Sequence, residues 1–466
     1  MISQSLSPDV EMECLCYFFS NYVNIPRDPT TNIFVEHILP LYLSAPLDSS
    51  LYRATSAVAI NVTQIWFTGR CNSFLARHAY TRAVSAVKVA VLDPVQIQSD
   101  ELLASVFMLD FYDSLNRRFF LSSGDSGLHK KGALALIRHR GPASFKTGVS
   151  RRLFTAIRSR QIVYSLQKRR KVELEPDFLA TDILDLPSAR LDLLIAELAN
   201  LHSDLDRGRS DTLTDKSIDS PDQVAFCKTI LRRSLMLDAK LHEWRQSLPS
   251  SWRPLTITDL NEIHPSIRAA GLYNGLCDVY SSLTVSHINN ASRSVHVAVL
   301  RLITYCNRIL ALGGAGFDAQ LQDYIDEQTQ ILVDSICASL PYHLGSRITT
   351  TLPHEHVEYP RVPPELRRQA KYVDAMGKDV EMTDKDHIRG ATALGGWFLI
   401  IALKALTTAA KWGGKPGLTA LNLREGQLDW IRGQMKRVKR LYQVPDIKQC
   451  EGAQSLSSFV MPFSNY

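Results

Sequence analysis

The chain has 466 residues, of which 45% are apolar and 21% are charged. This apolar share is enough for a packed core and excludes a disordered or fibrous protein, and average glycine and proline contents exclude a collagen-like one. The longest apolar stretch, residues 391–403, is shorter than the ~20 residues that cross a bilayer, so we expect no membrane partner.

Apolar residues recur at helical spacing through the first half of the chain. The spacing predicts helices over residues 80–92, 101–115, 129–139 and 151–166. Ser99 and Asp100 stand where short polar side chains cap the first turn of the second of these helices, and Pro94 limits the first. Gly141, followed by proline, is a stop signal for the third.

The second half shows the same spacing. It predicts helices over residues 191–201, 224–248, 267–312, 321–339, 391–411 and 428–442. Alternating apolar and polar residues are scarce, and the best such segment, residues 347–352, is short. The sequence therefore predicts an all-α fold, a multi-helix domain built of helical hairpins.

Two breaks interrupt the helical pattern. Residues 203–222 are polar and rich in turn formers, which favours a surface loop or a hinge, and residues 341–386 combine several prolines with a charged run. We expect an N-terminal segment at 1–29, one helical domain over 30–445 with 203–222 as a possible hinge, and a C-terminal tail at 446–466, with bounds that follow the family resemblance given below.

Positive charge is concentrated in one segment. Between residues 130 and 171 there are 13 basic residues and no acidic one, while the rest of the chain has 40 basic and 47 acidic residues. Three interpretations stay open: ion pairs with acidic helices of the same chain, a nuclear import address or acidic-partner site, and contact with nucleic-acid phosphates. The predicted address consists of Lys168, Arg169, Arg170 and Lys171, reinforced by Arg151 and Arg152.

Catalytic motifs are missing from the sequence, which contains no P-loop, no dinucleotide-binding glycine motif, no HExxH and no GxSxG. We therefore expect no enzymatic activity, no catalytic residues, no cofactor and no bound metal. The nearest metal-like group is His343, His354 and His356, whose spacing is typical of a solvated loop. His129 is expected to be a packed or capping histidine, and Cys14 and Cys16 are expected to be free thiols.

The order of several short motifs resembles a known family. The first half carries Tyr80-x-x-Ala83, Leu92-Asp93-Pro94, Leu109-x-Phe111-Tyr112, Gly132-Ala133-x-x-Leu136-Ile137 and Leu153-Phe154-x-x-Ile157-Arg158. The second half carries Leu241-x-x-Trp244, Leu248-Pro249, Trp252, Val279-Tyr280-Ser281-Ser282 with Asn290 and Arg293, Ile336-Cys337-Ala338-Ser339 and Ala393-Leu394-Gly395-Gly396. Over residues 30–445, this order resembles the regulatory domain of fungal Zn₂Cys₆-type transcription factors, in the branch called fungal-specific transcription factor domain 2.

The chain departs from this family at its N-terminus. The family's DNA-binding module holds two zinc ions with six closely spaced cysteines, but only Cys14 and Cys16 occur in the first 70 residues here. Either an upstream coding segment holds the zinc cluster, or the protein acts in trans on a regulator that binds DNA.

The resemblance implies a nuclear protein that regulates transcription, with fungal secondary metabolism as an implied target. Its expected partners are other transcription regulators or acidic protein segments, with DNA bound only indirectly or weakly through phosphates. A small-molecule-binding protein or an enzyme on the same helical body is the alternative.

Overall fold

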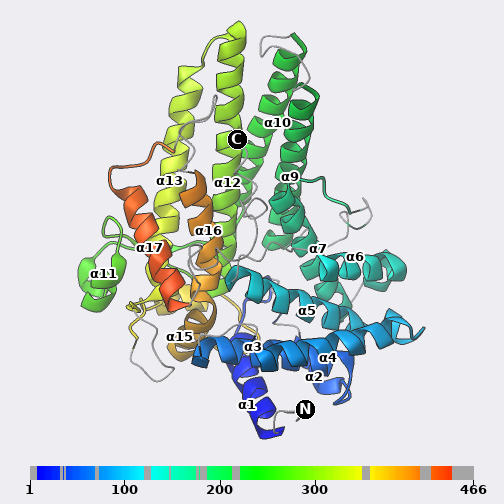
Figure 1. Ribbon diagram of the computed structural model, residues 1–466. Coiled ribbons are helices and arrows are strands. Elements are labelled where there is room, and N and C mark those ends of the chain that lie inside the picture. Colours follow the sequence, from blue (N-terminus) through cyan, green and yellow to red (C-terminus); the bar gives the residue numbers. More distant parts are fainter. Residues whose placement is uncertain are drawn as a thin grey trace. The chain divides into compact units, whose positions relative to one another are not determined.

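The computed structural model describes residues 8–31, 35, 38–68, 73–119, 127–145, 148–174, 178, 186–212, 221–348, 357–409 and 421–442 (Figure 1). Helices dominate these residues, and the only strands among them are two three-residue segments. The expected all-α fold is confirmed. The chain divides into two compact units: unit 1 holds Met1–Arg160, Lys371–Leu394 and Lys439–Phe459, and unit 2 holds Gln161–Ala370, Gly395–Val438 and Val460–Tyr466.

Unit 1 is built around one central helix. Its helices are α1 (Pro8–Phe18), α2 (Ile38–Ser44), α3 (Ser50–Thr68), α4 (Phe74–Val91), α5 (Asp100–Phe119) and α6 (Leu128–Arg140), followed by the first part of α7 (Gly148–Lys168). Helix α3 packs against α1, α4 and α5. Its buried positions include Ala54, Thr55, Ser56, Ala57 and Asn61, whose small side chains let neighbouring helices approach closely.

The predicted boundaries of α5, α6 and α7 lie within four residues of the observed ones, whereas α4 begins six residues before its predicted start. The Ser99 hydroxyl accepts a hydrogen bond of 3.1 Å from the Leu102 amide, which caps α5 as the sequence predicts. Helix α6 ends at Arg140 because Gly141 adopts a positive φ of 73°, a conformation that side chains disfavour. No helix was predicted before residue 80, so α1, α2 and α3 were missed, and residues 1–29, which contain α1, were expected only as an N-terminal segment.

Two later segments complete unit 1. Arg27 forms an isolated antiparallel bridge with Val373, which joins the chain after α1 to residues 371–394. In that segment α15 (Asp384–Gly390) begins with a reciprocal capping box between Thr383 and Asp386. The Tyr442 hydroxyl donates to the Ala391 carbonyl over 3.0 Å.

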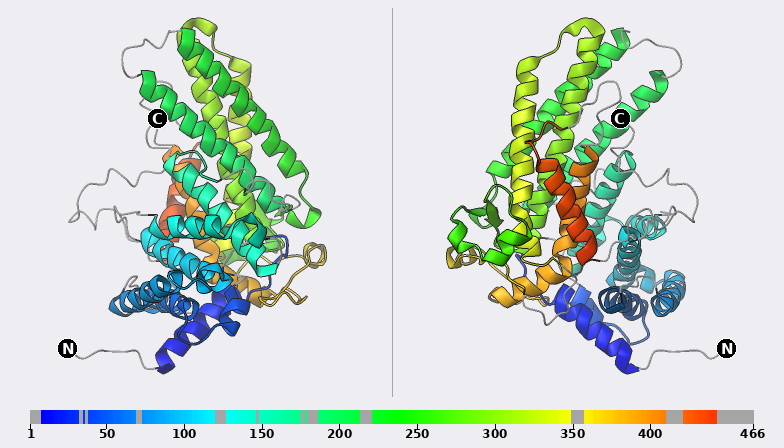
Figure 2. Two further views of the ribbon diagram at one scale, coloured as in Figure 1. Left: turned by 90° about the vertical axis from the view of Figure 1, so that its right-hand side faces the viewer. Right: turned by 60° about the vertical axis from the view of Figure 1, so that its left-hand side comes forward.

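Unit 2 contains a bundle of four long helices, α9 (Pro187–Thr212), α10 (Pro221–Gln246), α12 (Leu283–Leu310) and α13 (Ala319–Leu344). Helix α10 packs against both α9 and α12, and α12 packs against α13, so the four run side by side (Figures 1 and 2). Helix α16 (Gly396–Ala409) packs against α12 and α13. It is apolar nearly all round, as predicted, and buries Trp397, Leu399, Leu403 and Leu406.

Shorter elements complete the chain. They are α11 (Pro265–Gly271), α14 (Pro364–Arg368), α17 (Gln427–Leu441), the 3₁₀ turns η3 (Gln96–Gln98), η4 (Pro142–Phe145), η5 (Ser250–Trp252) and η6 (Leu260–Glu262), and the π segments η1 (Phe19–Val23), η7 (Ala311–Ala315) and η8 (Ala391–Gly395). The strands β1 (Leu255–Ile257) and β2 (Cys277–Val279) pair antiparallel, with Leu255 opposite Val279.

The prediction of one helix over residues 267–312 was wrong. Helix α11 ends at Gly271, whose φ is 138°, and the chain then forms β2 before α12 begins. Ser282 starts α12, because its hydroxyl accepts from the Val285 amide over 3.2 Å. The apolar spacing continues through the break, since the residues of β2 are buried as fully as those of α12.

The predicted loop at 203–222 was wrong in its first half. Helix α9 continues to Thr212, and residues 213–220 lie outside the described residues. The polar residues of this stretch form ion pairs on the helix surface, while Leu205 is only 1% exposed. Helices α9 and α10, on either side of the predicted hinge, both belong to unit 2 and pack together.

The predicted loop at 341–386 is largely irregular where it is described. Helix α13 extends into it as far as Leu344, and it also contains α14 and the start of α15. Residues 349–356 lie outside the described residues, and these include most of the alternating segment at 347–352. Irregular structure is therefore confined to residues 345–348, 357–363 and 369–383 of the described part of this range, and prolines occur only in the second of these stretches.

Two helical stretches, Leu283–Gly314 and Asp384–Thr408, are long and apolar enough to cross a membrane by length and composition. The apolar windows of these stretches are 78% and 61% buried within the structure. Such burial is typical of core helices, whose apolar surface is covered by neighbouring helices rather than by lipid.

Candidate functional site

The basic segment 130–171 meets acidic side chains of its own unit. In unit 1, the Asp110 carboxylate on α5 lies 3.0 Å from Lys130 Nζ on α6 and 3.0 Å from Arg160 Nε on α7. Burial alone would raise the pKa of Asp110, but the two cations lower it to about 2. The three charges thus form a largely buried triad that joins three helices.

A second pair lies near the start of α5. Arg140 Nη2 lies 2.7 Å from Asp100 Oδ1, and the Arg140 side chain is only 5% exposed. Asp100 Oδ2 accepts from the Ser150 hydroxyl at 2.5 Å. These contacts hold the end of α6 and the start of α7 against α5, so Arg140 stabilises the packing of unit 1.

The residues of the predicted nuclear address have two different environments. Arg169 binds Asp206 on α9 with two parallel hydrogen bonds, Nε to Oδ2 at 2.5 Å and Nη2 to Oδ1 at 2.7 Å. Lys171 Nζ lies 3.6 Å from Asp204 with its side chain 57% exposed, and Arg170 is exposed. Lys168 Nζ lies 5.9 Å from the centre of the Tyr164 ring.

The six predicted patch residues fall into two groups. Arg151 and Arg152, on the first half of α7, belong to unit 1, where Arg151 is half-buried and Arg152 is exposed. Residues 168–171 belong to unit 2. Of the three interpretations of the basic segment, intrachain ion pairing describes Lys130, Arg140, Arg160 and Arg169.

A separate cluster of polar groups lies inside the bundle of unit 2. Asp238 and His242 stand one turn apart on α10, and they meet His296 of α12 and Tyr324 of α13. His296 Nε2 lies 2.5 Å from Asp238 Oδ1, and the Tyr324 hydroxyl donates to Asp238 Oδ2 over 2.8 Å. We call Asp238, His242, Arg245, His296 and Tyr324 the histidine cluster.

Arg245 fixes the tautomers of both histidines in this cluster. Its Nη2 lies 2.8 Å from His296 Nδ1 and 3.3 Å from His242 Nδ1. Because a guanidinium only donates, both Nδ1 atoms must accept, and each Nε2 must then carry the proton. His296 Nε2 donates to Asp238, and His242 Nε2 donates to the Tyr324 hydroxyl over 3.1 Å.

The charges of the cluster agree with this assignment. Burial, together with the charge of Arg245, lowers the pKa of His242, and burial lowers that of His296 despite its bond to Asp238. Burial and the neighbouring Asp238 raise the pKa of Tyr324 to about 12. At neutral pH the histidines are thus neutral, Tyr324 is protonated and Asp238 is ionised.

The residues Asp238, His242 and His296 have the composition of a metal site, with their ligand atoms within 4.8 Å of one another. They do not fit a cation, because the Nε2 atoms that face Asp238 carry protons and lack the lone pair that a metal needs. Arg245 also places a positive charge against both imidazoles. The cluster is a closed hydrogen-bond network that ties α10, α12 and α13 together.

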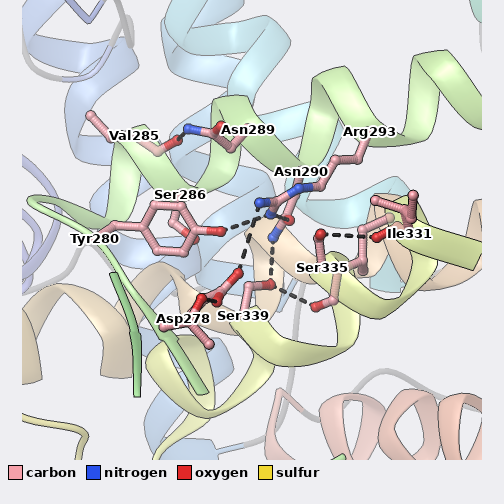
Figure 3. A network of polar contacts seen from close by, with 12 residues as sticks. Asp278, Tyr280, Val285, Ser286, Asn289, Asn290, Arg293, Ile331, Ser335 and Ser339 are labelled. Atoms are coloured by element: carbon pink, nitrogen blue, oxygen red, sulfur yellow. Dashed lines mark hydrogen bonds and ion pairs between the residues drawn. The ribbon is translucent and has the colours of Figure 1, made fainter. Parts of the chain in front are cut away.

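A second buried network lies on α12, close to its N-terminal end (Figure 3). Arg293 Nη1 donates to the Tyr280 hydroxyl at 2.7 Å and to Asn290 Oδ1 at 2.8 Å, and Asn290 donates to the Ser339 hydroxyl of α13. Arg293 Nη2 also lies 3.9 Å from the Asp278 carboxylate on β2. The network therefore joins β2, α12 and α13 within unit 2.

The single residues named from the sequence occupy structural positions. His129 is 8% exposed and its Nε2 lies 2.6 Å from the Tyr80 hydroxyl, as expected of a packed histidine. His343 was expected on a solvated loop, which was wrong, because it is fully buried on α13 and 2.8 Å from the Ser286 hydroxyl. His354 and His356 lie outside the described residues. Cys14 is buried and Cys16 exposed on α1, and both are free thiols.

Sequence reasoning missed the histidine cluster. Asp238 and His242 are four residues apart, the spacing that places two side chains on one helix face, and this signal was available. His296 stands 54 residues after His242, on a different helix, and no local pattern connects them. Comparison with protein-family models, with curated proteins and with solved structures gives no match for this chain.

Proposed function

We propose that this chain is a transcription-factor-like regulatory protein without a DNA-binding zinc cluster of its own. It works in the nucleus through contacts with other regulators or with acidic protein segments, and it co-regulates transcription of genes such as those of a fungal secondary-metabolite cluster. It binds DNA only indirectly or weakly through phosphates.

One observation supports this proposal above the others: several of the residues that carry the family resemblance are buried in the interior of the two units, although Leu92 and Pro94 are exposed. Trp252 and Tyr280 are fully buried, Trp244 Nε1 donates to the Pro187 carbonyl over 2.8 Å, and Asn290 with Arg293 forms the network of Figure 3. Motif residues in such positions specify a fold, as expected of a shared regulatory body.

The glycine of the last motif has the same kind of role. A Cβ atom on Gly395 would lie 2.1 Å from the His343 carbonyl oxygen, so only glycine allows the chain before α16 to approach α13 so closely. In unit 1, Leu153 and Arg158 of α7 are likewise fully buried. These positions support a scaffold whose function lies on its exposed surface.

A cellular experiment tests the proposal. The tagged full-length chain is expressed in a filamentous fungus, nuclei are isolated, and crosslinked partners are identified by mass spectrometry alongside transcript profiles with and without the gene. We expect DNA-binding regulators among the nuclear partners and a coherent set of altered transcripts. A protein confined to the cytosol, with unchanged transcripts, would contradict the proposal.

The nuclear address is tested separately. The double variant Arg170→Ala/Lys171→Ala removes two exposed cations, and Arg169→Ala, which removes the bidentate pair with Asp206, is the matched control. We expect nuclear exclusion of the double variant with little change in thermal stability. An unchanged nuclear distribution of the double variant would contradict a nuclear address at residues 168–171. The protein would then enter the nucleus together with a bound partner.

A further inference from the structure

Helix α4 presents a second positively charged surface. Its basic residues are spread along the sequence, so they are less conspicuous there than the basic segment. Apart from Val91, its exposed residues follow the helical repeat and so lie on one face: Phe74, Arg77, His78, Thr81, Arg82, Ser85, Lys88 and Val89, continued by Leu92. We call these nine residues the α4 face. The opposite side, with Ala76, Ala83 and Ala90, is buried, and α4 packs against α3 and α5.

The cations of the α4 face have no acidic partner within the described part of the chain. Arg77, Arg82 and Lys88 are exposed, and α4 itself contains no Asp or Glu. The nearest acidic residue in sequence is Asp93, whose carboxylate accepts from the Val95 and Gln96 amides. This differs from Arg140, Arg160 and Arg169 of the basic segment, which bind carboxylates on neighbouring helices.

The apolar side chains of this face stand at its two ends. Phe74 is 64% exposed at the start of α4, where it stacks on His78, and Val89 and Leu92 are 69% and 84% exposed at the end. Phe74 and Val89 are separated by about 22 Å along the helix, given 1.5 Å per residue. Between them lie Arg77, Arg82 and Lys88 and the hydroxyls of Thr81 and Ser85, which are bonded to carbonyls of their own helix.

We propose that the α4 face binds an acidic amphipathic helix of a partner protein. Such a helix places carboxylates opposite Arg77, Arg82 and Lys88, and covers Phe74 at one end and Val89 with Leu92 at the other. A nucleic-acid duplex would pair with the cations but leave the three large apolar side chains uncovered. A membrane surface needs a continuous apolar strip, and here the apolar ends are separated by charged and hydroxyl groups.

This inference deepens the proposed function, since it gives that function a surface and a partner class. The test uses purified full-length protein and a fluorescein-labelled peptide as long as α4, with 18 residues. The peptide carries glutamates along the middle of one helical face and leucines at both ends of that face. A scrambled peptide of equal composition, a DNA duplex and vesicles containing anionic lipid are titrated in parallel by fluorescence or co-sedimentation.

The variant Arg77→Glu/Arg82→Glu reverses two charges on the α4 face. The matched control, Lys228→Glu/Arg232→Glu, reverses two exposed cations on α10 that stand two turns and one turn before the exposed Met236. We expect the wild type to bind the peptide, the α4 variant to bind it at least about tenfold more weakly and the α10 variant to bind it within about twofold. Arg77→Ala/Arg82→Ala should weaken binding by a smaller factor in the same direction.

Three outcomes would overturn the inference: no peptide binding, equal weakening by both charge-reversal variants, or α4-dependent binding of DNA or vesicles in place of the peptide. Circular dichroism melts establish that each variant is folded. The assay requires neither a nucleus nor a transcript. Its failure would therefore contradict only the proposal that the α4 face is a binding site. Nuclear association and transcript changes would still support the proposed function.

Discussion

The basic segment 130–171 and the α4 face have the same sign of charge but different surroundings. Lys130 and Arg160 share the buried Asp110 carboxylate, and Arg169 binds Asp206 with two hydrogen bonds. The cations of the α4 face are exposed, and none has an ion-pair partner among the described residues. The density of charge in the sequence is therefore a poor guide to which charges are available to a partner.

The physical reason lies in desolvation. A buried cation loses its hydration and remains charged only if a carboxylate and hydrogen bonds replace the water, whereas an exposed cation keeps its water and needs no partner. In the basic segment, α5 and α9 supply those carboxylates from regions distant in sequence. These cations consequently stabilise helix packing, and exposed cations elsewhere remain to attract acidic partners.

The largest effect is expected for Asp110→Asn. Removing this carboxylate takes away the negative charge that Lys130, which is 7% exposed, shares with Arg160. We expect a loss of about 3–5 kcal/mol in the free energy of unfolding, measured by urea denaturation. A loss below about 1 kcal/mol would show that the triad does not hold unit 1 together.

A smaller effect on the free energy of unfolding is expected at the predicted address, and it should differ between Arg169 and Arg170. Arg169→Ala removes a bidentate pair whose arginine side chain is 9% exposed, and we expect a loss of about 1–2 kcal/mol. Arg170→Ala, at the exposed neighbouring position, should change the free energy of unfolding by less than about 0.5 kcal/mol. Equal effects in urea denaturation would contradict the distinction between the two positions.

The buried histidines predict a pH dependence. Burial lowers the pKa of His202 and of His296 below the ordinary value of 6.5. As the pH falls below 6.5, these histidines therefore bind protons in the unfolded chain before they do so in the folded chain. Stability should therefore fall as the pH is lowered from about 6.5 towards 5. His296→Gln should reduce this slope, measured by thermal melts across pH, and an unchanged slope would contradict the prediction.

The smallest effect is expected on α4. Arg82→Ala should change the free energy of unfolding by less than about 0.5 kcal/mol, because the side chain is exposed and has no ion-pair partner among the described residues. In the same urea titration, the free energy of unfolding could instead fall as much as it does for Arg169→Ala. That result would show that the cations of α4 stabilise the fold, and it would contradict the contrast with the basic segment.

The sequence predicts much of the helical architecture, because amphipathic spacing and caps are local signals. Ser99 and Gly141 define the start of α5 and the end of α6 as expected. It fails where burial is complete on all sides: α3 is covered by three neighbours, and the buried strand β2 is indistinguishable from the helix that follows. The polar end of α9 was misread because its ion-pair partners lie outside the local sequence.

The candidate sites were less predictable than the fold. The run of basic residues at 168–171 is visible in the sequence, but the pairing of Arg169 with Asp206 depends on how α9 returns alongside the chain after α7. The histidine cluster unites three helices, so no window of sequence contains it. On α4, basic residues at irregular intervals form one face only because the helix repeats every 3.6 residues.

The most direct test of the contrast compares two lysines in one labelling experiment. The native protein is treated with an amine-reactive acetylating reagent, and modification rates are followed by peptide mass spectrometry, with the unfolded chain as the reference. Lys88 should react at nearly the unfolded rate and Lys130 at least about a hundredfold more slowly, since Lys130 is buried beside Asp110. Similar rates for the two lysines would contradict the division between cations that hold the fold and cations that face a partner.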